Sequence, residues 1–201
     1  MHTLTDGPSN AEHLFLLAHG AGAPMDHPWM NEVARGMGAW GIRVVRFEFP
    51  YMARRREGGK RGAPDRQPVL LDVWRQVIEG HGGGGRVVIG GKSMGGRMAS
   101  LVADEAGVRG LLCFGYPFHP PGSPEKTRVA HLEHLRTPAL VIQGTRDPFG
   151  TRDDVQAYAL SPSIRVEWIE KGDHSLKGGL ERAIELAARF TMEHSRTSIP
   201  S

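Results

Sequence analysis

One stretch of the chain, Val87–Arg97, constrains the fold more than any other. It begins with three apolar residues, continues through Gly91-Lys92-Ser93-Met94-Gly95 and leads into a segment with helical spacing, Met98–Ala106. A Gly-x-Ser-x-Gly sequence between a strand and a helix is typical of a sharp turn that holds its serine in a strained conformation. The flanking glycines are needed because side chains there would collide with the turn. The stretch therefore predicts a raised Ser93 hydroxyl at a helix N-terminus, where developing negative charge is stabilised.

The same residues have a second interpretation, because Gly91-Lys92-Ser93 also resembles the end of a phosphate-binding loop, Gly-x-x-x-x-Gly-Lys-Ser. That loop needs a glycine at position 86, where this chain has Arg86, and flexible residues at the next three positions. Those positions are Val87, Val88 and Ile89, which are predicted to form a buried strand. The sequence therefore favours the serine turn over the phosphate loop.

Apolar runs alternate with helix-sized segments along the whole chain. The predicted strands are Leu14–Ala18, Ile42–Phe49, Arg86–Gly90, Gly110–Phe114, Ala139–Gly144 and Ile164–Ile169. The predicted helices are Pro28–Trp40, Val69–Ile78, Gly96–Ala106, Val129–Leu135, Asp153–Leu160 and Leu180–Glu193, with a long polar loop at Met52–Pro68. This alternation predicts an α/β fold with a doubly wound, mainly parallel sheet, whose ligand groups lie at the carboxyl ends of the strands. The 201 residues suit a single domain, 1–201, with its core at about 14–190 and a frayed tail at 194–201.

Composition excludes several classes of protein. A net charge of +3 is too small to favour a nucleic-acid binder, and a single cysteine, Cys113, excludes an intramolecular disulfide. Met1–Asn10 lacks the pattern of a signal peptide, and no apolar run reaches the roughly 18–20 residues that span a bilayer. We therefore expect a soluble, cytoplasmic protein that does not bind membranes and needs no cofactor. The oligomeric state is left open.

Two further loops at the predicted carboxyl edge supply what a serine nucleophile needs, a base and a carboxylate that orients the base. Asp147 follows the fifth predicted strand and His174 follows the sixth. The order Ser93, Asp147, His174 is that of α/β hydrolases and differs from the orders in chymotrypsin-like and subtilisin-like proteases. Asp153 and Asp154 are weaker candidates, because they lie at the start of the next helix. Asp173 has no predicted catalytic role, because it cannot orient the ring of its own neighbour.

A glycine-rich loop, His19-Gly20-Ala21-Gly22, follows the first predicted strand. Its N–H groups, together with that of Met94, are expected to form an oxyanion hole, and Ala21 is the preferred donor. The ring of His19 itself is predicted to be structural.

Other polar residues are weaker candidates for substrate contacts. His27 and His119 lie on loops at the active edge and are candidates for substrate contacts, although the sequence favours solvent-exposed loop positions for both. Arg54, Arg55 and Arg56 make the long loop basic, and their guanidinium groups suit a carboxylate or phosphate on a substrate. The alternative for these arginines is an ordinary solvated surface.

No metal site is predicted, because the histidines of His131-Leu132-Glu133-His134 lack further ligands nearby in the sequence. Cys113 lies within a predicted strand and is expected in the core.

The combined motifs resemble a small α/β-hydrolase family. The motifs are Leu17–Gly22, Phe47–Met52, Gly90–Arg97, Gly115–Pro120, Gly144–Gly150 and Gly172–His174. This family contains bacterial dienelactone hydrolase-like proteins, a testis-expressed hydrolase-like protein and a domain in a subunit of the nonspecific lethal histone acetyltransferase complex. The resemblance covers about Leu14 to Phe190 and implies the fold and the Ser-His-Asp triad more than a substrate. The chain departs from true dienelactone hydrolases, whose nucleophile is cysteine, because its turn carries Ser93.

The sequence thus predicts a minimal α/β-hydrolase fold without a lid, because only Gly115–Thr137 separates the fourth and fifth strands. The expected function is a serine hydrolase that acts on an ester or thioester of a small or short-acyl substrate. An anionic group on that substrate is one of the two interpretations of the basic loop. The alternative is a non-enzymatic interaction module that has kept the fold.

Overall fold

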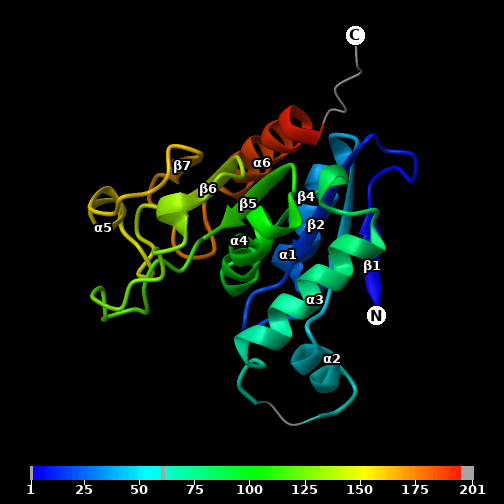
Figure 1. The fold of residues 1–201 in the computed structure, drawn as a ribbon, viewed down its shortest axis with the longest axis horizontal. Coiled ribbons are helices and arrows are strands. Elements are labelled where there is room, and N and C mark those ends of the chain that lie inside the picture. Colours follow the sequence, from blue (N-terminus) through cyan, green and yellow to red (C-terminus); the bar gives the residue numbers. More distant parts are fainter. Residues whose placement is uncertain (1, 60–61, 196–201) are drawn as a thin grey trace.

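In the computed structural model, which describes residues 2–59 and 62–195, seven strands form one sheet with the order β1-β3-β2-β4-β5-β6-β7 (Figure 1). The strands are β1 (Thr3–Asp6), β2 (His13–Ala18), β3 (Ile42–Phe47), β4 (Val88–Lys92), β5 (Gly110–Phe114), β6 (Ala139–Gly144) and β7 (Ile164–Ile169). The helices are α1 (Pro28–Ala39), α2 (Pro50–Arg56), α3 (Gln67–Gly80), α4 (Met94–Ala106), α5 (Arg152–Gln156) and α6 (Leu180–Ser195). β1 is antiparallel to β3, and the other neighbouring strands are parallel.

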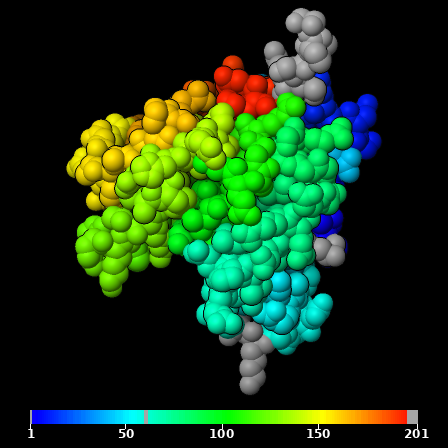
Figure 2. Space-filling view, in the orientation of Figure 1, coloured from blue at the N-terminus to red at the C-terminus, as the bar shows by residue number. Residues whose placement is uncertain are grey.

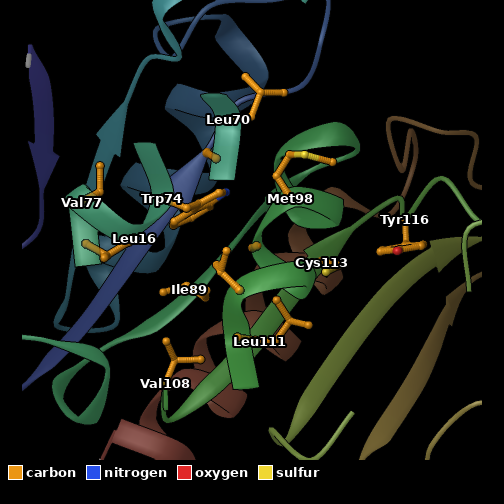
Figure 3. Close-up of a cluster of buried hydrophobic side chains, with 14 of the residues drawn as sticks. Leu16, Leu70, Trp74, Val77, Ile89, Met98, Val108, Leu111, Cys113 and Tyr116 are labelled. Carbon is orange, nitrogen blue, oxygen red and sulfur yellow. The ribbon is translucent and has the colours of Figure 1, made fainter. Parts of the chain in front are cut away.

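Helices cover both faces of this sheet. On one face, α3 and α4 bury apolar side chains such as Trp74 and Met98 against residues of β2, β4 and β5, among them Ile89 and Cys113 (Figure 3). On the other face, α1 and α6 pack over a second cluster that contains Phe15 and Leu140. The middle strands are buried on both faces and therefore consist of continuous apolar runs. These runs are what located the strands in the sequence.

The predicted doubly wound, mainly parallel sheet is confirmed, but the structure contains two elements that we did not expect. β1 is a short, half-exposed edge strand with the sequence Thr-Leu-Thr-Asp, too polar to be found by hydrophobicity. α2 replaces the first part of the predicted Met52–Pro68 loop. It begins with Pro50 in its first turn and buries Tyr51 and Met52, so tertiary packing stabilises this helix. The arginines that follow make the segment resemble a polar loop in the sequence.

Three predicted helical segments also differ from the structure. Asp153–Leu160 is helical only as far as Gln156, where α5 ends. Val129–Leu135 forms only a single 3-10 turn, Leu132–His134, because the Asp104 carboxylate binds the N–H groups of Arg136 and Thr137 and holds the following chain extended. The last helix continues through two residues of the predicted tail and ends at Ser195, whose hydroxyl bonds Nδ1 of His13 at 2.8 Å. Positions 196–201 of that tail lie outside the described residues.

Between β5 and β6 the described chain forms loops and the one 3-10 turn, so no helical lid covers the carboxyl edge of the sheet. Figure 2 shows the loop after β5, in yellow-green, and the α2 region, in cyan, as separate lobes on the same side of the molecule. Of the helices in the described ranges, none combines the length and apolar character that crossing a membrane requires.

Candidate active site

The turn between β4 and α4 holds Ser93 in a rare backbone conformation. Its φ of 51° and ψ of −115° lie in a region that non-glycine residues seldom adopt. A Cβ on Gly91 would lie 2.5 Å from the Ala18 carbonyl oxygen, and one on Gly95 would lie 2.6 Å from that of His19. The two glycines are therefore required because β2 and its loop pass directly against the turn.

Ser93, His174 and Asp147 form a continuous hydrogen-bonded chain. Nε2 of His174 lies 2.9 Å from the Ser93 Oγ, and Nδ1 lies 2.8 Å from Oδ2 of Asp147. Because an ionised carboxylate only accepts, we assign the ring proton to Nδ1, which leaves the Nε2 lone pair facing the hydroxyl. The three residues follow β4, β6 and β7, so parallel strands bring together positions that are up to 81 residues apart.

Asp147 is fully buried and is held by more than the histidine. Oδ1 accepts the N–H of Phe149 at 2.9 Å, and Oδ2 also accepts Nε2 of Gln143 at 2.9 Å. Gln143 is itself buried in β6, and its Oε1 accepts the N–H of Tyr116 at 2.8 Å. We did not predict a role for Gln143. Its signal in the sequence is a lone amide at the end of an otherwise apolar strand, four residues before Asp147.

The loop that carries His174 is held from three sides. The Asp173 carboxylate accepts the N–H groups of Ser175 and Lys177, so it shapes the turn and does not contact the ring. Phe149 lies 4.2 Å from the His174 ring, measured between centroids. The ammonium group of Lys92 donates to the His174 carbonyl oxygen. The ring can therefore move little relative to the serine.

Two backbone N–H groups are available beside the serine. Met94 begins α4, and Ala21 lies on the glycine-rich loop after β2. Among the described residues, neither N–H donates a hydrogen bond to a protein acceptor. The loop is fixed from below by the buried His19, whose Nε2 accepts the Phe49 N–H at 3.1 Å and whose Nδ1 donates to the Gly20 carbonyl at 2.7 Å. The predicted structural role of His19 is confirmed, and burial lowers the pKa of its ring.

A pocket of about 400 Å³ opens directly over the serine. Its walls include Ala21, Trp29, Lys92, Phe149 and His174, and most of the exposed surface inside it is apolar. This volume falls within the usual range for small-molecule sites.

Comparisons with known proteins identify the family and the fold. A family model described as an alpha/beta hydrolase domain matches residues 11–195. The chain belongs to this α/β hydrolase family.

Solved structures of other α/β hydrolases have the same fold. The chain is similar to a dienelactone hydrolase from Anabaena variabilis, with 22% identity, a TM-score of 0.75 and coverage of 96% of this chain and 92% of that one. It is also similar to an α/β serine hydrolase without a lid from Xanthomonas campestris, with 18% identity, a TM-score of 0.72 and coverage of 98% and 90%. A serine hydrolase homologue from Coxiella burnetii has 20% identity, a TM-score of 0.71 and coverage of 94% and 90%.

The two candidate histidines of this α/β hydrolase have different positions. His27 lines the pocket and is exposed, and its Nδ1 accepts the N–H of Trp29 at the start of α1. His119 is buried away from the pocket, contrary to our expectation. Its ring contacts the Pro120 carbonyl at 2.8 Å and the Asp154 carboxylate at 3.3 Å, so it links its own loop to α5.

The three candidate arginines are largely committed to the protein's own acceptors. Arg54 pairs with Asp65, and Arg56 binds the carboxylates of both Asp26 and Glu48. Arg55 donates to the Gly62 carbonyl and lies over the ring of Tyr51. Arg55 and Arg56 line a neighbouring cavity of about 350 Å³, which shares Gly22 with the serine pocket.

Two minor expectations can also be compared with the structure. Cys113 is buried in β5, as predicted, and burial raises the pKa of its thiol. No group of three or more metal-ligating side chains gathers anywhere in the described ranges. The ring of His131 instead bonds the Ser100 hydroxyl at 2.8 Å.

Proposed function

We propose that this α/β hydrolase is a serine esterase or thioesterase in which Ser93 is the nucleophile. The observation that carries the proposal is the unbroken chain from the Ser93 hydroxyl through both nitrogens of His174 to the buried Asp147. A tight serine turn alone would not need a histidine at hydrogen-bond distance, or a carboxylate behind that histidine.

In this proposal, His174 takes the serine proton as Oγ attacks the carbonyl carbon, and Asp147 stabilises the imidazolium that forms. The N–H groups of Ala21 and Met94 bind the oxyanion of the tetrahedral intermediate. His174 then protonates the leaving group, which departs and leaves an acyl-enzyme. Water attacks the acyl-enzyme by the same route in reverse, and the released acid restores the free serine.

The substrates that we propose are small esters or thioesters with short acyl chains. The support is the absence of a helical lid over the described carboxyl edge, together with a pocket of about 400 Å³. A narrower kinship, with the testis-expressed and chromatin-complex relatives, stays a prediction from the sequence motifs.

Labelling with a fluorophosphonate probe tests the nucleophile, and a chain-length series of p-nitrophenyl esters tests the substrate class. Wild type should be labelled and should hydrolyse acetyl and butyryl esters faster than long-chain esters presented as micelles. Ser93→Ala should lose all labelling and keep its circular dichroism spectrum. Equal labelling of wild type and Ser93→Ala would reject the proposal.

A non-enzymatic interaction module is the second candidate. It predicts that wild type is neither labelled by the probe nor active on any ester, although it is folded. The polar chain from Ser93 to Gln143 argues against this candidate, because a scaffold gains nothing from a histidine aimed at a strained serine.

A further inference from the structure

The residue immediately before the serine, Lys92, has no role in the mechanism above, although its side chain lines the same pocket. It is the last residue of β4 and is only partly accessible to solvent. Among the described residues that line the pocket, Lys92 is the only lysine, arginine or acidic residue. The positive charge closest to the proposed reaction is therefore this ammonium group, rather than the arginines of α2.

The ammonium group lacks a counter-ion of its own. Within the described part of the chain, it forms no ion pair with a carboxylate. It donates one hydrogen bond, to the His174 carbonyl oxygen, and lies 5.7 Å from the centroid of the Trp29 ring. An ammonium group has three N–H donors, and only one of them is used by this hydrogen bond, so the others can bind a ligand.

The surroundings of Lys92 make this arrangement costly. Burial lowers its pKa to about 8, and the nearby charges of Asp147 and Asp173 oppose that shift. Asp147 is already committed to His174, Gln143 and Phe149, and Asp173 to two backbone N–H groups. A partly desolvated cation of this kind is stabilised when a ligand supplies the missing negative charge.

The backbone around Lys92 leaves room for the ammonium group. Gly115, at the end of β5, has a φ of +62°, and a Cβ there would lie 3.0 Å from Nζ and 2.7 Å from the His174 carbonyl oxygen. A side chain at position 115 would therefore displace the ammonium group, the histidine loop or both.

We propose that Lys92 determines substrate specificity, by binding a carboxylate that the substrate carries within a few bonds of its scissile carbonyl. The inference rests on the proposed function, because it takes Ser93 as the nucleophile. The Lys92 ammonium group contacts His174, whose ring bonds the Ser93 hydroxyl, and all three residues line one pocket, so a group bound by Lys92 lies close to one attacked by Ser93. One ammonium group neutralises one charge, which matches a carboxylate better than a phosphate monoester carrying about −1.5 to −2.

Two matched pairs of esters test the inference. One pair places the charge on the acyl part: the p-nitrophenyl monoester of succinate against p-nitrophenyl butyrate. The other places it on the leaving group: 4-carboxyphenyl butyrate against phenyl butyrate. In at least one pair, wild type should prefer the anionic ester in kcat/KM by about tenfold to hundredfold, the range expected for a charge-assisted hydrogen bond.

Three variants connect that preference to Lys92. Lys92→Met should abolish it, and Lys92→Arg should keep most of it. Lys126→Met, which removes the same charge from the exposed loop after β5, should leave it unchanged. The preference of wild type should also decline as the pH rises above about 8, as Lys92 loses its proton.

Fluorophosphonate labelling separates failure of the inference from failure of the proposed function. If wild type is labelled at Ser93 but shows no preference in either pair, the inference is wrong and the serine mechanism stands. The same holds if Lys92→Met lowers kcat/KM for charged and neutral esters equally, because Lys92 would then only position the His174 loop. If wild type is neither labelled nor active on any of the four esters, both proposals are rejected.

Discussion

Three Ser–His pairs in the described part of the chain lie at nearly equal hydrogen-bond separations, and two of them involve a serine in or beside α4. Of these two, only one has the surroundings of a nucleophile. Ser93 and His174 lie 2.9 Å apart, and Ser100 and His131 lie 2.8 Å apart. Both serines belong to the same short region, one at the start of α4 and the other in its second turn. The distance between hydroxyl and imidazole therefore does not distinguish them.

The Ser100–His131 pair differs from the Ser93–His174 pair in which group donates the hydrogen bond. The Ser100 hydroxyl donates to the Arg97 carbonyl at 2.8 Å, so the imidazole of His131 must donate to Ser100 and cannot act as its base. In the described chain, no carboxylate bonds that ring. Burial, and then the charge of Arg97, lowers the pKa of His131 to about 4. Ser100 is buried, whereas Ser93 faces a pocket.

Whether a serine next to a histidine can act as a nucleophile therefore depends on the groups that surround the two residues. The strained turn frees the Ser93 hydroxyl from helical acceptors, and the carboxylate fixes the tautomer of His174. The start of α4 presents a backbone N–H to developing charge. Ser100 lies one helical turn beyond the region where the helix terminus can assist.

The largest expected difference between the two pairs is the effect of removing the imidazole. His174→Ala should lower kcat on a short-chain p-nitrophenyl ester by about 10⁴-fold or more, because the general base is lost. His131→Ala should change kcat by less than about threefold, since it touches neither substrate nor triad. The assay should be run well below the melting temperature of both variants. Similar losses in the two variants would remove the distinction between the pairs.

Replacing Asp147 by asparagine makes the first pair resemble the second, which has no carboxylate. Asp147→Asn should lower kcat by about 10⁴-fold, because the amide favours the wrong tautomer of His174. The matched control is Asp173→Asn, which alters the neighbouring carboxylate and should cost less than about tenfold, because that group only shapes the loop. A larger loss in the control would mean that the orienting carboxylate has been misassigned.

The support behind Asp147 should have a smaller effect. Gln143→Met keeps a similar volume and removes the amide that donates to Oδ2 of Asp147. We expect kcat to fall by about tenfold, with KM nearly unchanged, since the residue acts through Asp147 and does not reach the pocket. An unchanged kcat, measured with the short-chain ester, would show that Phe149 and His174 suffice to hold the carboxylate.

The smallest expected effect concerns stability. The pKa of His131 is about 4 in the folded protein and about 6.5 when the residue is unfolded, so the unfolded chain binds a proton first as the pH falls. The stabilisation is therefore complete above about pH 6.5 and is lost progressively towards pH 4. After allowing for partial exposure, we expect a loss of about 1 kcal/mol by pH 5.

Urea unfolding of wild type and His131→Asn at about pH 7 and pH 5 measures this loss. The difference between the two pH values should be smaller in the variant by that amount. An identical pH dependence in both proteins would show that the ring is not the titrating group.

Much of this protein could be predicted from its sequence. Ser93 and Asp147 were located because each follows a buried apolar strand, and His174 because it follows the half-exposed edge strand β7. Parallel strands must bring their carboxyl ends to one edge. The glycine pattern around Ser93 can also be recognised in the sequence, although the contacts that require it come from β2 and the loop after it. The central strands were found for the same reason, because their burial on both faces leaves a continuous apolar run.

Other features were decided only by the tertiary structure. β1 is recognised through its pairing with β3, and α2 is stabilised by two side chains that enter the core. The sequence places three arginines in one basic run, but only the folded chain pairs Arg54 and Arg56 with carboxylates from other segments. Likewise, only the folded chain places Gln143 behind Asp147 and leaves Lys92 in the pocket wall with no ion pair to a carboxylate of residues 2–59 or 62–195. The positions of strands and turns follow from local patterns, whereas the partners of a buried polar group depend on long-range contacts that no short stretch of sequence encodes.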